Sequence, residues 1–528
     1  MFSGKKRQAV NGLRVVSLGY LMLPSLLFLA TWVRPAAGSV CIGLLLASAI
    51  LLLRNGTRFS DASYPALTPR NLTGVGLLTL GLSVAFGMGE FTRQVLDFHT
   101  NNYKYYDLAQ LEWPVFYRDY QAYLCYYIAY YLPVSWVCKF VGLEWGRYLS
   151  LGWSWLGIGL AFAWVLPFAG RKPWLFLVLL LLFSDSWIFI KMLRMADLAG
   201  PYLPPNYIDI HGFRLFAYAP YNDQIAWAPQ HLIPALIAGM YLTFLNLNRA
   251  RWWGVEVALL MGSCVLWSPL AVIGCLPFVL FLLWKYRVSL LHDGFQLLVM
   301  AVVTAGFLPV LSYLVSTDAM SIASTNMFIW ETGEPSWPLY YLFFVGANFA
   351  VWIPLVLGAD RAVRPWFWVA QASLALLPLY RIGVYNDLLT RGSVPAVSVV
   401  AVLVVRQLIE FKNHRRGLYG LFVVFFAVNA LSPLRFFTRL FPFTPPDNTI
   451  EHPFLLGSGN TLDYLAKQYG GPTAARQYIL KKDSGFERYF LRQTGRGAGV
   501  TSAPPYSRPS SSVRSAPADP AGAAPLPR

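Results

Sequence analysis

A polar loop after the third long apolar stretch carries the side chains best suited to acid–base chemistry. Between Glu90 and Pro114, the sequence holds an isolated carboxylate at Asp97 and an imidazole at His99. At the head-group level of a membrane a carboxylate is partly desolvated, which strengthens its basicity. We therefore predict that Asp97 is a general base that takes a proton from a hydroxyl group. His99 would orient the substrate or help to hold a phosphate or a metal.

Other interpretations of this loop stay open. Asp97 on its own is equally consistent with a solvated loop acid. Asp107 and Glu112 are weaker candidates for the base, because they flank an amphipathic segment and we expect them to face water.

Two further polar clusters follow, each at the end of an apolar segment. Lys191 and Arg194 are placed to meet the charge of a lipid phosphate, with simple interfacial anchoring as the alternative. Arg391 stands four residues after Asp387, so the two would share one face of a helix and could pair. We predict that these three basic residues bind an anionic phosphate group. Further polar residues of the clusters and of the loop between them are predicted to bind substrate: Asp197, His211, Asp223, His231, Asn386 and Asp387.

Metal and nucleotide motifs are not evident. The histidine spacing fits no standard zinc motif, so we assign no metal ligands and expect no certain cofactor, with a divalent metal as an alternative. No phosphate-binding glycine-rich loop and no nucleophile elbow occurs. The five cysteines lie mostly in apolar segments and are expected to be small buried hydrophobic residues.

Composition places these clusters in a membrane protein. Apolar residues make up 56% of the 528 residues and charged residues only 13%, whereas soluble domains carry about 25% charged residues. Long apolar segments predict an all-α polytopic fold, and the short alternating segments of a β-barrel are absent. The formal charge of +17 is dispersed through short loops, so we predict contact with membrane lipids and no nucleic-acid partner.

The basic residues also predict the orientation of the chain. Lysines and arginines near the N-terminus place it in the cytoplasm, and the later inner loops are short and basic. We expect about 13 spans, with the long loops and the C-terminus on the outer face. The expected spans are 13–32, 40–53, 72–89, 149–166, 174–190, 231–245, 255–267, 270–284, 297–315, 338–357, 366–379, 394–405 and 418–429.

The assignment of the tyrosine-rich segment 120–140 determines on which side of the membrane every later loop is expected. Tyrosine prefers the membrane–water boundary, so we expect one interfacial helix on the outer surface, with a full span as the alternative. The interfacial choice puts the later basic loops inside, which the positive-inside rule favours. Residues 1–430 then form the transmembrane domain, 431–496 a small outer region, and 497–528 a disordered tail rich in Pro, Ser and Ala.

The order of these parts resembles the GT-C superfamily of integral membrane glycosyltransferases. That family has an early outer loop with an acidic motif followed by Trp and Pro, as Asp97 is followed here by Trp113 and Pro114. Later similarities are a Tyr/Pro-rich segment leading to an Arg, a Gly-Arg turn, and an outer Arg followed by Asp. The corresponding residues are Tyr130 to Pro133 with Arg147, Gly170 with Arg171, and Arg194 with Asp197. The chain departs from the family at Phe98, which replaces a glutamate, and in having two spans before the loop.

The resemblance implies a function. The donor would be a polyprenyl-phosphate sugar, the base Asp97, and the phosphate ligand Arg194 or Arg391. Transfer to an acceptor hydroxyl would invert the sugar through an oxocarbenium-like state. The acceptor would be a lipid-linked glycan, a polysaccharide or another envelope component, at the periplasmic face of a bacterial inner membrane. The alternative is a flippase or polymerase of lipid-linked glycans, which would need charges buried within its spans; this chain has few.

Overall fold

The computed structural model describes most of the chain between residues 2 and 493. The described residues are 2–55, 64–95, 97–186, 188, 209–210, 213–214, 216, 218–248, 250–318, 326–358, 361–383, 386–410, 416–438, 460–468 and 475–493. One compact unit spans Met1–Arg492. The predicted tail, 497–528, lies outside the described residues.

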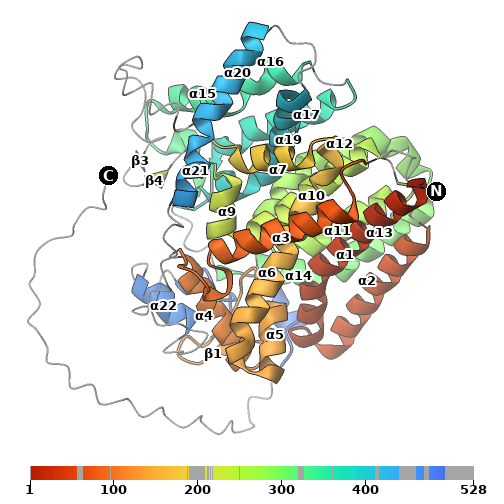
Figure 1. Ribbon diagram of the computed structural model, residues 1–528. Coiled ribbons are helices and arrows are strands. Elements are labelled where there is room, and N and C mark those ends of the chain that lie inside the picture. Colours follow the sequence, from red (N-terminus) through yellow and green to blue (C-terminus); the bar gives the residue numbers. More distant parts are fainter. Residues whose placement is uncertain are drawn as a thin grey trace, which may run out of the picture. The chain divides into compact units, whose positions relative to one another are not determined.

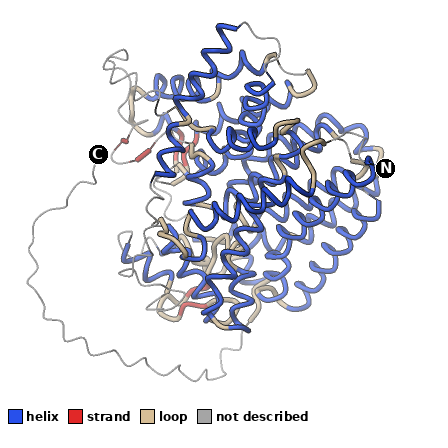
Figure 2. Tube along the Cα trace, viewed as in Figure 1, coloured by secondary structure: helices blue, strands red, loops and turns tan. Residues whose placement is uncertain are grey.

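Helices dominate the described chain (Figures 1 and 2). Proline occupies the first turn of many of them, where its missing N–H costs nothing. The helices are Phe2–Thr31 (α1), Pro35–Asn55 (α2), Pro69–Ala85 (α3), Asp97–Gln110 (α4), Leu132–Val141 (α5), Gly146–Ala163 (α6), Pro173–Leu182 (α7), Tyr221–Trp227 (α9), Pro229–Leu247 (α10), Trp253–Val265 (α11), Pro269–Leu291 (α12), Gly294–Gly306 (α13), Leu308–Val315 (α14), Trp337–Asn348 (α15), Ile353–Val356 (α16), Arg364–Leu376 (α17), Asp387–Gly392 (α18), Val394–Glu410 (α19), Arg416–Asn429 (α20), Leu431–Thr438 (α21), Thr461–Gln468 (α22) and Gly485–Tyr489 (α24).

Short elements connect these helices. Single 3₁₀ turns cover Met88–Glu90 (η1), Leu143–Trp145 (η2), Leu166–Phe168 (η3), Ile329–Glu331 (η6), Ala350–Trp352 (η7) and Leu377–Leu379 (η8). Three antiparallel pairs of two-residue strands join Phe116–Tyr117 (β1) to Ala122–Tyr123 (β2), Asp209–Ile210 (β3) to Phe213–Arg214 (β4), and Met327–Phe328 (β5) to Tyr380–Arg381 (β6).

Several helices are long and apolar enough to cross a membrane. Seven described stretches meet this criterion, and α13 with α14, bent by 44°, would make an eighth. This confirms a mostly helical chain with several helices long and apolar enough to span a membrane. The other five predicted spans fall on α3, α7, α11, α17 and α19, which have 10 to 17 residues, fewer than the usual span of about 20.

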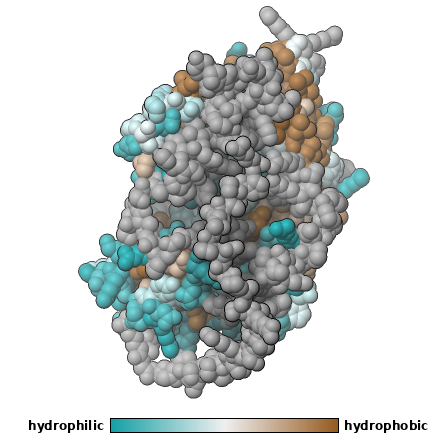
Figure 3. All heavy atoms as spheres, turned by 90° about the vertical axis from the view of Figure 1, so that its left-hand side faces the viewer, coloured by the Kyte–Doolittle hydropathy of each residue, from teal (hydrophilic) through white to brown (hydrophobic). Residues whose placement is uncertain are grey.

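The buried centre and the apolar surface belong to different helices. In α10, 94% of the spanning window is buried, against 28% in α2 and α12. The outer helices therefore turn broad apolar faces outward, as lipid-facing helices do. Figure 3 shows described apolar residues gathered in the upper part of one face and hydrophilic ones in the lower part.

The polar side chains inside the bundle gather at opposite ends of α10. His231 is near its start, whereas Tyr241 and Asn246 are near its end, about 22 Å away along the helix from His231 to Asn246. At the start of α10 lie Ser268 and Arg391. At its end lie the buried Arg14–Glu256 pair and Lys285, which donates to Asn246. The start of α10 corresponds to the predicted outer face, and its end corresponds to the predicted inner face.

The prediction of one continuous helix over residues 120–140 is wrong. Only α5 is helical there, and its ten residues span about 15 Å, half the thickness of a bilayer core. Three of the preceding tyrosines, Tyr123, Tyr130 and Tyr131, are buried inside the protein. Tyr130 bonds to Ser154 and Tyr131 donates to Asn101, so other parts of the chain satisfy their hydroxyl groups.

Candidate functional site

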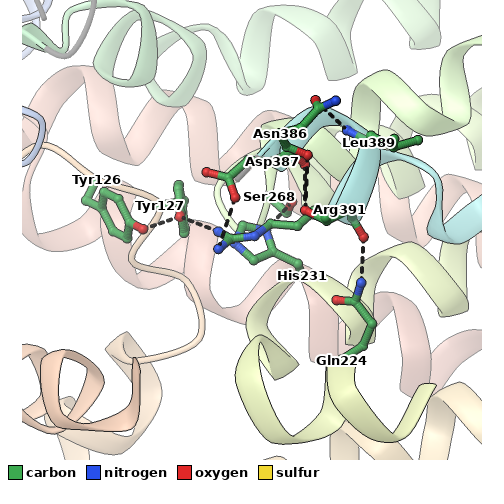
Figure 4. A network of polar contacts seen from close by, with 10 residues as sticks. Tyr126, Tyr127, Gln224, His231, Ser268, Asn386, Asp387, Leu389 and Arg391 are labelled. Carbon is green, nitrogen blue, oxygen red and sulfur yellow. Dashed lines mark hydrogen bonds and ion pairs between the residues drawn. The ribbon is translucent and has the colours of Figure 1, made fainter. Parts of the chain in front are cut away.

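Arg391 is the centre of a polar network at the start of α10 (Figure 4). Its Nη1 donates to the Tyr127 hydroxyl at 3.2 Å and to Nε2 of His231 at 2.9 Å. Its Nη2 pairs with Oδ1 of Asp387 at 3.3 Å, which confirms the predicted pairing on one helix face. The guanidinium is partly exposed, with 21% of the side chain accessible, so it can still meet a ligand.

The short helix α18 holds Arg391 in place. Asn386, in the left-handed region with φ 50°, caps this helix and accepts the N–H of Leu389. On the other side, α12 approaches so closely that a Cβ at Gly274 would lie 1.9 Å from the carbonyl oxygen of Gly392. Only glycine fits that approach, so the position of Arg391 is fixed by packing as well as by the cap.

His231 holds the Arg391 guanidinium by a hydrogen bond. It is fully buried, and its Nδ1 lies 2.6 Å from Oγ of Ser268. Because arginine only donates, Nε2 of His231 must accept, which leaves the proton on Nδ1 to bond Ser268. Ser268 also caps α12 by accepting the N–H of Ala271. His231 was predicted at the junction of the polar loop and the span 231–245, and the structure shows it there as a buried neutral imidazole that orients Arg391.

A pair of tyrosine hydroxyls extends the network. The Tyr126 hydroxyl donates to that of Tyr127. The Tyr127 oxygen thus accepts two bonds, from Tyr126 and from Arg391, and its own O–H has no acceptor among the described residues. Burial raises the pKa of Tyr127, so this hydroxyl stays protonated at neutral pH. A protonated donor beside a guanidinium is suited to an anionic ligand.

Lys104 of α4 lies on the far side of the same tyrosines. Only 2% of it is exposed, and its Nζ is 4.4 Å from the centre of the Tyr126 ring. The ammonium also donates to Asn101 at 3.3 Å. A buried cation in contact with an aromatic face is stabilised by the ring quadrupole. Lys104 therefore adds positive charge behind the Tyr126–Tyr127 pair.

A small hollow lies next to α18 and the start of α19. Gln224 of α9 connects the two, because its amide lines the hollow and donates to the Thr390 carbonyl at 2.5 Å. Most of the lining is aromatic or aliphatic: Phe183, Tyr218, Pro220, Tyr221, Val394 and Val397. The predicted Asp223 is half-buried on the same helix as Gln224.

The structure places only some of the predicted site residues. It brings His231, Asn386, Asp387 and Arg391 together. Asp97 begins α4 and His99 follows in it, but their side chains lie outside the described residues. Lys191, Arg194, Asp197 and His211 lie outside them entirely. Within the described part of the chain, no three His, Cys, Asp or Glu side chains come close enough to hold a metal.

The expectation that Asp107 faces water is wrong. It is only 1% exposed and accepts the Tyr117 hydroxyl at 2.7 Å and the Thr461 N–H at 2.9 Å. The bond from Thr461 fastens α22 to α4, the bond from Tyr117 fastens β1 to α4, and α22 and α4 lie side by side in Figure 1. Asp107 is therefore a structural carboxylate between the early loop and the C-terminal region.

This carboxylate makes the stability of the fold depend on pH. Burial raises the pKa of Asp107 from 3.8 to about 6, against the opposing effect of its hydrogen bonds. Since the folded state holds the proton more tightly, the stabilisation is complete below pH 3.8 and is lost as pH rises through about 6. The difference corresponds to roughly 3 kcal/mol. We expect the free energy of unfolding of the wild type in detergent to fall by about this amount between pH 4 and pH 7. The fall over the same pH range should be smaller for Asp107→Asn. Parallel curves for the two proteins would exclude this role.

Comparisons of the chain with protein-family models, curated proteins and solved structures found no match. The chemistry of the cluster must therefore indicate the function. Sequence reasoning missed Lys104, Tyr126, Tyr127 and Ser268, which complete the cluster. A usable signal was present for Lys104, a lysine flanked by tyrosines in a chain with few charges.

Proposed function

We propose that this protein is a membrane glycosyltransferase of the GT-C type. It would move a sugar from a polyprenyl-phosphate donor to a hydroxyl of a lipid-linked glycan, polysaccharide or other envelope acceptor. The observation that carries the proposal is the cluster at the start of α10, where the partly exposed Arg391 bonds the Tyr127 hydroxyl, whose own O–H has no acceptor among the described residues. Guanidinium and hydroxyl groups that donate hydrogen bonds at the head-group level of a membrane are suited to bind a phosphate group.

The chemistry follows from this assignment. Asp97 would take the proton of the acceptor hydroxyl, whose oxygen then attacks the anomeric carbon of the donor. The bond between that carbon and the phosphate oxygen breaks, and the polyprenyl phosphate leaves with its electron pair. Arg391 and Tyr127 would stabilise the negative charge that develops on the leaving phosphate, as preorganised donors do.

The architecture that we propose has about 13 spans, with the shorter helices crossing as part of the bundle. The cluster would then lie at the outer face, the periplasmic side of a bacterial inner membrane, and the N-terminus in the cytoplasm. Residues 460–493 would belong to the outer region, because α22 packs on the early outer loop.

The decisive experiment is a transfer assay with purified protein. A panel of polyprenyl-phosphate sugars is offered together with lipid-linked glycan and polysaccharide acceptors. We expect transfer of sugar from at least one donor, with inversion at the anomeric carbon. Binding of donor and movement of it between bilayer leaflets, without any transfer, would contradict the proposal and favour the flippase alternative.

Arg391→Met is expected to weaken binding of a polyprenyl phosphate by about 10- to 100-fold, the size of one or two hydrogen bonds to a charged group. Binding is measured in nanodiscs of neutral phospholipid. The matched control is Arg406→Met, because Arg406 makes the same four-residue ion pair, with Glu410, within α19. Equal affinities of the two variants would remove Arg391 from the site.

A further inference from the structure

The described C-terminal residues 475–492, here named the strap, connect segments that are far apart in the sequence. Backbone hydrogen bonds of 2.8 to 3.0 Å join the strap to residues 32–34, 123–125 and 316–318. Within it, the buried ring of Phe486 packs against aromatic side chains of α1 and α14. The strap is therefore an integral part of the fold, held at both ends.

The strap brings Tyr478 into the cation–tyrosine cluster. The carbonyl of Tyr478 accepts the N–H of Cys125 at 2.8 Å, and its ring stacks on Tyr126 with centroids 4.0 Å apart. The Lys104 Nζ lies 5.1 Å from the ring centroids of both Tyr478 and Tyr131. Together with the contact to Tyr126, three aromatic rings form a cage around this ammonium.

Lys104 contributes charge to the site without reaching it directly. Because it is only 2% exposed, a bound ligand would not contact it. Its ammonium lies against the Tyr126 ring, whose hydroxyl bonds to Tyr127, and Tyr127 in turn bonds Arg391. Asp387 offsets the charge of Arg391. Lys104 therefore adds a second cation on the side of Tyr126, next to the Arg391–Tyr127 contact.

We propose that the strap is a component of the anion site, in which Tyr478 positions Lys104 and Lys104 supplies the second positive charge for a phosphate held by Arg391 and Tyr127. The proposal rests on the function proposed above, because it assumes a phosphate ligand at Arg391. It assigns to the C-terminal region a role in binding the donor, in addition to its role in stability.

The test measures binding of a polyprenyl phosphate in neutral nanodiscs. Lys104→Met keeps the length of the side chain and removes its charge, and a buried methionine is well tolerated. We expect about tenfold weaker binding, because one unit charge near the site is lost. Binding by this variant should also depend less on salt, because one cation is missing. A merely structural role would leave the salt dependence unchanged.

Substitutions that remove or keep the aromatic ring test the role of Tyr478. Tyr478→Leu is expected to weaken binding about fivefold through loss of the cation–π contact, and Tyr478→Phe should keep binding within about twofold of wild type. The control is Tyr464→Leu, which removes a tyrosine that stacks on Tyr103 of α4 outside the cage. Thermal unfolding of each variant identifies those that fail to fold, and Lys104→Met then decides the question.

The outcomes separate this proposal from the proposed function. If wild type and Lys104→Met bind equally and with the same salt dependence, while Arg391→Met binds weakly, the role of Lys104 is overturned and the phosphate site stands. If Tyr478→Leu binds as well as Tyr464→Leu, the strap has no part in binding. If wild type binds no polyprenyl phosphate, the proposed function itself fails.

Discussion

Asp97→Asn is expected to slow sugar transfer by about 100- to 10,000-fold, the range that a general base contributes. The asparagine keeps the size of the side chain but accepts no proton from the acceptor hydroxyl. Its backbone begins α4, the helix that carries Lys104 seven residues later. The loss should fall on kcat, because the donor phosphate is held by other residues. Steady-state transfer rates at several donor concentrations give kcat and KM separately.

Glu112→Gln is the matched control for Asp97→Asn. Glu112 is an acidic residue of the same polar loop, and it lies past the end of α4. We expect its neutralisation to leave kcat within about threefold of wild type, since it would remove no proton acceptor from the site. Full activity of Asp97→Asn would exclude Asp97 as the base, and equal losses in both variants would indicate a general effect of charge.

The second large effect is expected at the opposite end of the bundle. Glu256 of α11 is fully buried, and it accepts hydrogen bonds from Arg14 of α1 and from Tyr241 of α10. Glu256→Gln keeps the shape of the side chain but leaves the Arg14 guanidinium, which is only 4% exposed, without its counter-charge. Breaking a buried ion pair in this way costs about 3–5 kcal/mol. The free energy of unfolding in detergent, followed by circular dichroism during denaturant titration, measures this loss.

Two comparisons identify the cause of that loss. The double variant Arg14→Met with Glu256→Met replaces both charges by apolar groups, so we expect stability within about 2 kcal/mol of wild type. Glu410→Gln breaks a partly exposed ion pair with Arg406, and such pairs contribute about 0.5 kcal/mol. A loss in Glu256→Gln no larger than in Glu410→Gln would show that the buried pair does not stabilise the bundle.

Buried charge is a feature in which a transferase and a flippase would differ. A path for a lipid-linked glycan would need charged groups distributed along the spans. Among the described residues, buried ionisable side chains include the Arg14–Glu256 pair at the end of α10, Lys104 beside Tyr126, and Asp107 between α4 and α22. The sequence had not indicated the buried Arg14–Glu256 pair. The distribution of buried charge therefore does not separate the two classes, and the transfer assay does.

The pattern of apolar segments was enough to predict a helical membrane protein. The reason is physical, because a span must satisfy its own backbone in lipid and must be apolar along its whole length. The same pattern placed both ends of α10, the end of α1 and the start of α12 within two residues of where they lie. Local chemistry also predicted the Asp387–Arg391 pair, since residues four apart on a helix are neighbours whatever surrounds them.

The interior of the site depends on contacts that local sequence does not encode. Tyrosine was assigned to the lipid interface because its ring is apolar and its hydroxyl polar, but Asn101 and Ser154 satisfy the hydroxyls of Tyr131 and Tyr130 within the protein. Asp107 was expected in water, and only packing of α22 against α4 buries it.

The sequence by itself therefore determined the class of fold, the apolar segments and the polar residues at their ends. Only the tertiary structure decided that Lys104, Tyr127, His231 and Arg391 form one cluster, because they come from α4, an irregular segment, α10 and α18. Hydropathy is a property of each segment alone, whereas a binding site is a property of the distances between segments. Those distances are set by side-chain packing, such as the contact of Gly274 with Gly392, between residues more than a hundred positions apart.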